Sequence, residues 1–386
     1  MNPHQDADQK QREKRTKTAA IIGLGNIGSP LVGLIARLPF LKRLIVLDRD
    51  VYEEKNRATQ AISARDVNRP KAFVQAERAR AITPELALDP IHDAIENVPI
   101  GALRADILLT CLDSKISRQY VNALAWRLGI PWVDAGVLAD ALMARITVYV
   151  PNFHAPCLEC SWDARSYKDL EIERPCQAPG SAVAPTNAPA HLGSLAASLQ
   201  ATECAKILSG SWHSVAVGRQ ILIDASSHKL IETAYRRNPR CRFDHHLWRI
   251  HRLQRGPGEL TIGQTLQQVT DATEDVTIRV EGKAFHTRLR CECGEQKPLF
   301  YLQGRMPADE WNCPRCKHRM AAIGFDMLPR ASVRSLSGEY LSQTLASIGF
   351  RPGDVFIAAG NGPERYYELI NNGTKEGEDD GNTTND

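Results

Sequence analysis

Apolar and polar positions alternate along residues 18–150 in a pattern that predicts strands separated by helices. Short apolar runs at 19–22, 44–47 and 105–112 have the length and composition of buried strands. Between the first two runs, the apolar positions of residues 31–38 recur at the three- and four-residue spacing of a helix. Because strands alternate with helices, we expect an α/β fold, a Rossmann-like and mostly parallel sheet with helices on both faces.

A glycine-rich turn separates the first strand from the first helix. The turn contains Gly23, Gly25, Asn26 and Gly28. In such a turn the first glycine permits a tight bend, the second lets the backbone approach a phosphate, and the third lets the helix pack on the strand. Asp48 ends the second strand, 20 residues after Gly28, where an acid can accept the ribose hydroxyls. The pattern therefore predicts a nucleotide site, with the helix N-terminus facing the phosphates.

Composition changes along the chain and predicts where its parts begin and end. Residues 1–17 are polar and basic, and we expect a flexible arm. Residues 18–250 form the nucleotide-binding domain, crossed at 151–190 by a loop rich in Pro, Cys and charge. We expect residues 251–370 to form a smaller α+β domain of mixed strands, and residues 371–386 to be a disordered acidic tail.

The overall composition excludes several classes of protein. Of 386 residues, 43% are hydrophobic and 24% are charged, as in soluble globular proteins with room for two domains. A net charge of +3 is too small to indicate nucleic-acid binding. No apolar run reaches membrane-spanning length, and the N-terminus lacks the apolar core of a signal peptide. We therefore expect a cytoplasmic protein that binds neither nucleic acid nor a membrane.

Four of the ten cysteines form two closely spaced pairs in the C-terminal domain. They are Cys291, Cys293, Cys313 and Cys316. The pairs are separated by 19 residues, a spacing that is typical of a zinc ribbon and favours Zn²⁺ over disulfides. Such a site can staple a small domain or recognise a partner protein. The C-terminal α+β domain is therefore expected to contain a zinc ribbon.

The loop after the second strand begins a longer series of polar residues than a dinucleotide site requires. The series runs through Asp48, Asp50, Asn56, Gln60, Lys71, Asp113 and Arg118. Together with the glycine turn, it resembles the ubiquitin-activating superfamily, which includes the bacterial molybdopterin and thiamine adenylating proteins. The resemblance covers about residues 18–246 and implies that ATP and Mg²⁺ bind here.

The resemblance implies roles for most residues of this series. Asp48 would bind ribose, Asn56 and Lys71 would contact phosphates, and Asp113 would hold Mg²⁺. Adenylation of a carboxylate proceeds by attack on the α-phosphate while pyrophosphate leaves, so the site must neutralise the triphosphate charge. The further positions counted as cofactor-binding are Gly23, Gly25, Asn26, Gly28, Asp50 and Gln60. Arg118 matches a family position without a firm role.

One position departs from the family pattern. The arginine expected three residues after Asn56 is replaced by Thr59, whereas Arg57 lies next to Asn56. Either Arg57 reaches the γ-phosphate from a shifted register, or an arginine of a partner subunit replaces it. Arg12 and Arg15 are candidates for the second case, although an ordinary solvated basic tail is the simpler interpretation. Because homodimeric relatives supply such an arginine across the interface, the resemblance implies a homodimer.

The resemblance also implies a second zinc site. Cys157 and Cys160 form a Cys-x-x-Cys knuckle, and relatives place zinc between such a pair and a second pair that follows the last strands. Here the second pair would be Cys241 with His245 or His246, in place of two cysteines. We take Cys157, Cys160, Cys241 and His245 as the predicted ligands. Buried free thiols are the alternative.

Cys176 lies alone in the crossing loop. At this place eukaryotic-type activating enzymes carry the cysteine that accepts the modifier as a thioester. The neighbouring Arg174 would favour the thiolate form of such a cysteine. The alternative is an incidental loop cysteine. Cys111 and Cys204 fall in apolar strand and helix patterns, and we expect both in the core.

Together these features predict an ATP-dependent activating enzyme for a ubiquitin-like protein. It would adenylate the C-terminal glycine carboxylate of the modifier, capture it as a thioester and pass it to a conjugating enzyme. The predicted catalytic residues are Cys176, Arg57, Lys71 and Asp113. The additional C-terminal domain fits a bacterial ubiquitin-like conjugation system.

Three alternatives stay open. The nearest is a molybdopterin- or thiamine-type adenylyltransferase that stops at the adenylate and feeds sulfur transfer. The second is an NAD-dependent oxidoreductase, in which Asn56, Lys71 and Asp113 would have no role. The third is a non-catalytic zinc-bearing scaffold, which the displaced arginine would favour.

Overall fold

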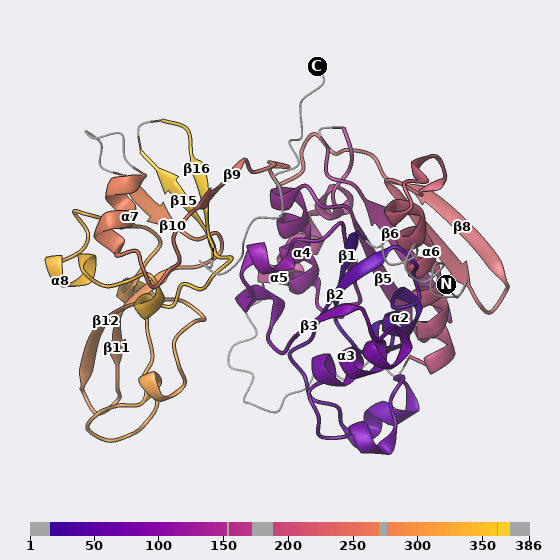
Figure 1. Cartoon of the computed structure of the whole chain (residues 1–386), viewed down its shortest axis with the longest axis horizontal. Coiled ribbons are helices and arrows are strands. Elements are labelled where there is room, and N and C mark those ends of the chain that lie inside the picture. Colours follow the sequence, from indigo (N-terminus) through magenta and orange to yellow (C-terminus); the bar gives the residue numbers. More distant parts are fainter. Residues whose placement is uncertain (1–15, 153, 172–187, 270–275, 361, 371–386) are drawn as a thin grey trace, which may run out of the picture. The chain divides into compact units, whose positions relative to one another are not determined.

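The computed structural model divides the chain into two compact units (Figure 1). It describes residues 16–152, 154–171, 188–269, 276–360 and 362–370. The first unit comprises Met1–Val98 and Leu103–Trp248, and the second comprises Pro99–Ala102 and Arg249–Asp386. None of the helices in the described ranges is both long and apolar enough to cross a membrane.

The first unit is built on an eight-stranded sheet in the order β3-β2-β1-β4-β5-β6-β7-β8 (Figure 1). The strands are β1 (Lys17–Ile22), β2 (Leu41–Leu47), β3 (Ala87–Ile91), β4 (Ile107–Thr110), β5 (Trp132–Leu138), β6 (Met143–Tyr149), β7 (Arg219–Asp224) and β8 (Lys229–Ala234). Neighbouring strands from β3 to β5 run parallel, whereas those from β5 to β8 are antiparallel. The structure therefore confirms the predicted α/β class and its parallel-rich sheet.

Helices cover both faces of this sheet. They are α2 (Gly28–Ile35), α3 (Lys71–Ile82), α4 (Lys115–Leu128) and α6 (Ala190–Leu208), and the unit also contains α5 (Ala164–Glu171). Ala19 and Ile21 of β1 share one core with α2, α3 and α6, whereas the alternate residues Ala20 and Ile22 face the other side, where α4 packs on β4 (Figure 1). Burial of each such isoleucine contributes about 1.5–3 kcal/mol, so the alternation fixes the strand's orientation.

Two elements of the first unit differ from what the sequence pattern predicts. The pattern does not reveal β3, because this edge strand contains Pro90 and all of its residues are at least partly exposed. The segment 151–190, expected to be a loop, contains the helix α5 in its described part. Residues 172–187 of that segment lie outside the described residues.

The order of the strands reverses its direction near the centre of the sheet. The chain runs from β1 to β2 and β3 on one side and then returns to β4 on the other. The carboxyl ends of β1 and β4 therefore meet at a topological switch point, where α/β sheets bind ligands. Gln200 of α6 braces this point, because its Nε2 donates to the carbonyls of Thr110 at 3.1 Å and Val133 at 2.7 Å.

The second unit is a smaller α+β fold with two sheets. One sheet has the order β14-β10-β15-β16-β9, and the other has the order β12-β11-β13. The strands are β9 (Ile250–Leu253), β10 (Thr277–Arg279), β11 (Phe285–Arg290), β12 (Gln296–Leu302), β13 (Met327–Leu328), β14 (Ala331–Ser332), β15 (Val355–Ala359) and β16 (Arg365–Leu369). The helices α7 (Ile262–Gln268) and α8 (Gly338–Leu341) accompany them. Phe285 and Phe300 stack in its core with ring centroids 4.8 Å apart.

Candidate functional site

The glycine turn packs closely against the ends of the neighbouring strands. Gly23 has a φ of +91°, and its N–H donates to the carbonyl of Leu47 at 2.9 Å. A Cβ on Gly23 would come 2.6 Å from the carbonyl oxygen of Cys111, and one on Gly28 would come 1.9 Å from the carbonyl oxygen of Gly23. A Cβ on Gly25, in contrast, would meet no atom within 4 Å. The turn thus excludes side chains where it packs and leaves its backbone open at Gly25, where a phosphate can approach.

Asp48 at the end of β2 is held by the glycine turn. Its Oδ2 accepts the N–H of Leu24 at 2.6 Å, and its Oδ1 accepts the N–H of Asp50 at 2.8 Å. Burial raises the pKa of Asp48, and the Lys71 ammonium lowers it in part. Each carboxylate oxygen keeps a second lone pair that can accept a ribose hydroxyl.

Lys71, the first residue of α3, is buried against the same loop. Its Nζ lies 3.2 Å from Oδ2 of Asp50 and 5.7 Å from the ring centroid of Tyr52. The buried Tyr52 hydroxyl donates to the carbonyl of Leu24 at 3.0 Å and accepts from Nε2 of Gln75 at 2.8 Å. Tyr52 and Gln75 therefore join α3 to the glycine turn. Neither residue belongs to a motif, so the sequence alone does not single them out.

Asn26 connects the glycine turn to the segment before α6. Its Nδ2 donates to the carbonyls of Thr59 at 2.8 Å and Ala188 at 2.9 Å. Gly193 of α6 permits this approach, since a Cβ there would come 1.8 Å from Oδ1 of Asn26. Oδ1 of Asn26 and Oε1 of Gln60 are buried acceptors without a hydrogen-bond partner among the described residues.

Asn56 and Arg57 lie in a 3₁₀ turn after β2. Asn56 is buried, and its Oδ1 accepts the N–H of Glu53 at 2.8 Å, so this side chain stabilises its own turn. Arg57 forms an ion pair with Glu54 on the surface. Among the described residues, no hydrogen bond or ion pair joins Asn56 or Arg57 to Lys71.

Asp113 follows β4 at the switch point and is exposed. It forms no hydrogen bond or ion pair with the residues that the structure describes. Nearby, Nη2 of Arg118 donates to the carbonyls of Leu112 at 2.5 Å and Ala135 at 3.2 Å, and its Nε lies 3.1 Å from Oδ1 of Asp134. Arg118 therefore ties strand ends together, whereas Asp113 has free carboxylate oxygens for a metal.

Several of the predicted residues lie in parts of the chain that the structure does not describe. Those that lie outside the described residues are Arg12, Arg15, Arg174 and Cys176. Direct contacts join the glycine turn, Asp48, Asp50 and Lys71 into one group.

Cys204 is buried in the core, and Cys111 donates to Oε1 of Gln200 at 3.3 Å. Burial raises the pKa of both thiols, so neither is suited to act as a nucleophile.

Cys157, Cys160, Cys241 and His245 come together in the first unit. Their four ligand atoms lie within 4.8 Å of one another, and Sγ of Cys157 is 3.8 Å from that of Cys160 and 3.7 Å from that of Cys241. A tetrahedral ion with bonds of about 2.3 Å would separate its sulfur ligands by about 3.8 Å. A hydrogen bond from Cys157 lowers the pKa of Cys160, which favours the thiolate.

The ring of His245 has the orientation that a metal ligand needs. Its Nδ1 lies 2.7 Å from the carbonyl oxygen of Phe243, to which it donates, and its Nε2 lies 3.3 Å from Sγ of Cys160. His246, the alternative ligand, is exposed and outside the cluster. The donor set therefore fits Zn²⁺ with His245 as the fourth ligand.

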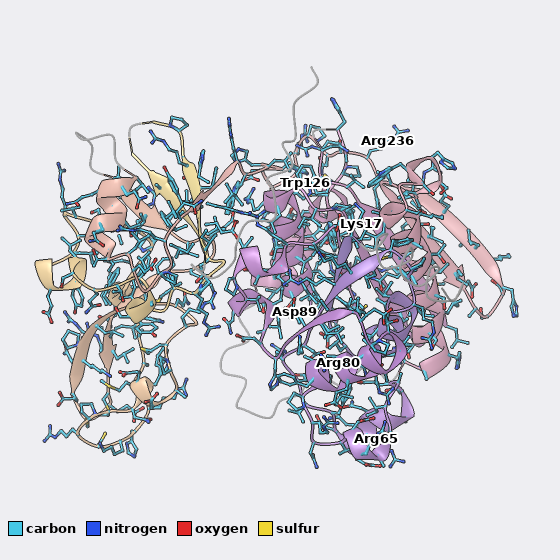
Figure 2. All side chains as sticks on the ribbon, viewed as in Figure 1. Lys17, Arg65, Arg80, Asp89, Trp126 and Arg236 are labelled. Carbon is cyan, nitrogen blue, oxygen red and sulfur yellow. The ribbon has the colours of Figure 1, made fainter. Side chains whose placement is uncertain are left out.

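Helix α4 supports the loop that contributes Cys241 and His245. Trp126, labelled in Figure 2, meets the ring of His245 edge-on with centroids 4.7 Å apart. Arg127 donates to both carboxylate oxygens of Asp244 at 2.6 and 3.0 Å, and its guanidinium lies 5.0 Å from the ring centroid of Trp248. The sequence alone does not single out Trp126 and Arg127, because their helical spacing is typical of ordinary core positions.

Cys291, Cys293, Cys313 and Cys316 form a second cluster, in the second unit. Their sulfur atoms lie within 4.8 Å of one another, with Cys291 and Cys316 3.4 Å apart and Cys293 and Cys313 3.6 Å apart. Gly294 has a φ of +88°, and its N–H donates to the carbonyl of Cys291 at 3.0 Å. This turn lets the first pair of thiols converge on one point. The described cysteines are free thiols, and the cluster fits a tetrahedral Zn²⁺ ion.

Comparison with known proteins places this site in a family. The model of the ThiF family matches residues 3–243. The chain belongs to the ThiF family. The E1-like adenylating superfamily deduced from the sequence is thereby confirmed. The match ends at residue 243, before Arg249–Asp386, which make up most of the second unit.

The relatives of this ThiF-family chain include proteins with several named activities. The sulfur carrier protein ThiS adenylyltransferase of Escherichia coli K12 is 27% identical over 223 residues, which cover 57% of this chain and 83% of that protein. The SAMP-activating enzyme E1 of Haloferax volcanii is 26% identical over 224 residues, which cover 57% of this chain and 77% of that enzyme. The ubiquitin-like modifier-activating enzyme 5 of Gallus gallus is 26% identical over 167 residues, which cover 39% and 42% of the two chains.

Solved structures with a similar fold include Escherichia coli MccB in complex with ATP. The TM-score is 0.48 with 22% sequence identity, and the match covers 60% of this chain and 67% of MccB.

The two clusters predict a zinc content that can be measured. Elemental analysis of the purified protein should find about two zinc ions per chain, because each cluster supplies four ligands. Cys241→Ser and Cys313→Ser should each lower the content to about one ion, since each removes a ligand from a different cluster. Cys111→Ala, outside both clusters, should leave the content unchanged. A wild-type protein with one zinc ion or none would remove at least one of the two sites.

Proposed function

We propose that this protein is an ATP-dependent adenylyltransferase that acts on the C-terminal carboxylate of a ubiquitin-like or sulfur-carrier protein. The family match over residues 3–243 carries the proposal most directly. The glycine turn, Asp48 and Lys71 support it, because they gather a ribose acceptor and a phosphate partner beside an open backbone. Family membership also argues against the NAD-dependent oxidoreductase considered above.

The proposed reaction transfers AMP from ATP to the carboxylate. A carboxylate oxygen attacks the α-phosphorus and forms a new P–O bond. The bond between the α-phosphorus and the bridging oxygen breaks, and its electron pair leaves with pyrophosphate. Mg²⁺, held by Asp113, would neutralise charge on the phosphate oxygens.

The residues of the chain prepare this reaction by binding and orientation. The ion pair between Lys71 and Asp50 keeps the ammonium beside the turn, and half of the Asp50 side chain is exposed, so a triphosphate can compete for the lysine. The free lone pairs of Asp48 can accept the ribose hydroxyls. The buried Oε1 of Gln60 lacks a donor among the described residues and can accept a hydrogen bond from the nucleotide.

We further propose that the carboxylate belongs to a ubiquitin-like modifier, which Cys176 captures as a thioester for a conjugating enzyme. The names of the relatives support activation of ubiquitin-like and of sulfur-carrier proteins alike. The second candidate is therefore a sulfur-carrier adenylyltransferase whose work ends at the adenylate. The two functions differ in whether this chain forms a covalent bond to the modifier.

Replacement of Asp113 tests the adenylation step. Asp113→Ala should lower ATP–pyrophosphate exchange, driven by a panel of ubiquitin-like and sulfur-carrier proteins, by roughly 100-fold or more, since it removes a proposed metal ligand. Asp309→Ala, an exposed carboxylate in the second unit, serves as the matched control and should keep full exchange. Unchanged exchange in Asp113→Ala would refute the assignment of this residue. No exchange by the wild-type protein with any panel member would favour the non-catalytic scaffold.

Replacement of Cys176 tests the thioester step separately. Thiolate attack on the acyl-adenylate forms a C–S bond and releases AMP, which is a good leaving group. Cys176→Ala should keep ATP–pyrophosphate exchange but lose the higher-mass band that thiols cleave on a non-reducing gel. Cys176→Ser should convert that band into an ester that resists thiols and yields to hydroxide. Survival of the thiol-sensitive band in Cys176→Ala would place the acceptor elsewhere and favour the sulfur-carrier function.

The displaced family arginine leads us to propose a homodimer. Thr59 occupies the position of that arginine, and the surface ion pair of Arg57 with Glu54 offers no contact to Lys71. Light scattering should therefore give a particle of twice the 42.8 kDa chain mass at micromolar concentration. A monomer at that concentration would contradict the dimer and leave Arg57 as the remaining candidate.

A further inference from the structure

A charged cluster lies beside the switch point on β5 and β6. Asp134 of β5 is fully buried, and its Oδ1 accepts the hydroxyl of Thr110 at 2.9 Å. Nε of Arg118 lies 3.1 Å from Oδ1 of Asp134, and Nη1 of Arg145 lies 3.0 Å from Oδ2. Two guanidinium groups therefore share one carboxylate, and the cluster keeps one net positive charge. A largely buried excess charge of this kind is favourable for binding an anion.

The two arginines differ in how many of their donors are used. Nη2 of Arg118 donates to the carbonyls of Leu112 and Ala135, so this side chain is committed to the strand ends. Arg145 bonds one described residue, Asp134, through Nη1. Its Nε and Nη2 have no partner among the described residues. These two nitrogens form the edge of a guanidinium that binds carboxylates with two parallel hydrogen bonds.

Gly136 makes room for this guanidinium. Gly136 pairs with Arg145 across β5 and β6, and a Cβ there would come 3.2 Å from both Nε and Nη2 of Arg145. The side chain of Arg145 keeps 27% of its surface exposed, whereas that of Asp134 has none. Arg145 is therefore anchored at one nitrogen, while part of its side chain stays exposed.

The register of the strands sets the position of Arg145 relative to the proposed catalytic residues. β4 ends at Thr110, opposite Asp134, and Gly136 lies two residues farther along β5, about 7 Å beyond that end. Arg145 therefore stands at the level of the loop that carries Asp113. In the strand order β2-β1-β4-β5-β6, Asp48 and the glycine turn lie on one side of Asp113, and Arg145 lies on the other.

We propose that Arg145 binds the C-terminal carboxylate of the protein substrate, an inference that rests on the proposed adenylation. Nucleotide contacts are supplied from β1 and β2, so the attacking carboxylate approaches from the β5 and β6 side. Nε and Nη2 of Arg145 each donate to one carboxylate oxygen, and each oxygen keeps a lone pair for attack on the α-phosphorus. Arg145 thereby selects a free carboxylate over a neutral end group.

Peptide binding tests this role without turnover. The probe is a fluorescein-labelled decapeptide that ends in Gly-Gly, prepared with a free carboxylate and with a C-terminal amide. Fluorescence anisotropy with and without a non-hydrolysable ATP analogue should show that the wild-type protein binds the acid at least about tenfold more tightly than the amide. Arg145→Gln should bring this ratio close to one. Arg145→Lys, which keeps the charge but not the fork, should give an intermediate ratio.

Controls separate the proposed contact from general effects. Arg219 is an exposed residue of β7 that pairs with Glu232, so Arg219→Gln should keep the wild-type acid-to-amide ratio. Asp134 keeps Arg118 as a partner in Arg145→Gln, and an unchanged melting temperature would confirm that the variant is folded. Affinity for the ATP analogue is measured on its own, so a wild-type protein that binds no nucleotide refutes the proposed function independently of the acid-to-amide ratio.

Three results would overturn the assignment of Arg145. The first is an unchanged acid-to-amide ratio in Arg145→Gln. The second is a wild-type protein that binds neither peptide or binds both equally. The third is that Arg145→Gln loses affinity for the ATP analogue while it keeps the acid-to-amide ratio. The last result would assign Arg145 to the triphosphate.

Discussion

The backbone contact between Gly28 and Gly23 is the constraint on which the first unit's site depends. A Cβ on Gly28 would come 1.9 Å from the carbonyl oxygen of Gly23, so α2 starts directly on the turn that precedes it. Within this turn, the N–H of Leu24 donates to the carboxylate of Asp48. The carbonyl of Leu24 accepts the hydroxyl of Tyr52. The N–H and the C=O of Leu24 thus each bond a neighbouring segment. A shift of the turn would therefore displace β2 and α3 together.

The lysine and the two arginines of the site are paired with carboxylates before any nucleotide arrives. Lys71 is paired with Asp50, and Asp134 is paired with Arg118 and Arg145. These two groups differ in exposure, because Asp50 is half exposed whereas Asp134 is fully buried. Water and ligand phosphates can therefore compete for Lys71, while the buried carboxylate of Asp134 fixes its arginines in place.

The sequence predicts those parts of the fold that depend on local spacing. Apolar periodicity predicts β1, α2 and β2, the glycine positions predict the turn, and cysteine spacing predicts the ribbon cluster. The helix α5 and the edge strand β3 escape prediction, because the first lies in a Pro- and Cys-rich segment and the second is exposed and contains Pro90. Local pattern carries no signal for either element.

Long-range partners escape prediction for a different reason. Tyr52 and Gln75 are hydrogen-bonded although they lie 23 residues apart in the sequence. Asn26 forms a hydrogen bond with the segment before α6, 162 residues away. Arg145 reaches Asp134 only because β5 and β6 pair in a register that places Gly136 opposite the arginine. Such contacts follow from strand order and register, which hydrophobic patterns do not specify. The choice of His245 over His246 likewise depends on backbone geometry, since His245 has a φ of +56° that turns its ring inward.

The two cysteine clusters stabilise different kinds of structure. The first joins Cys157 to Cys241 across 84 positions, and closing a loop of that length in the unfolded chain is worth about 4–5 kcal/mol by the argument used for disulfides. The second joins Cys291 to Cys316 across 25 positions, and its thiols share a small core with Leu289 and Met320. A metal in the first cluster would therefore connect the end of the sheet to α4, through Trp126 and Arg127. A metal in the second cluster would stabilise the segment around Leu289 and Met320, whose small hydrophobic core is too small to fold alone.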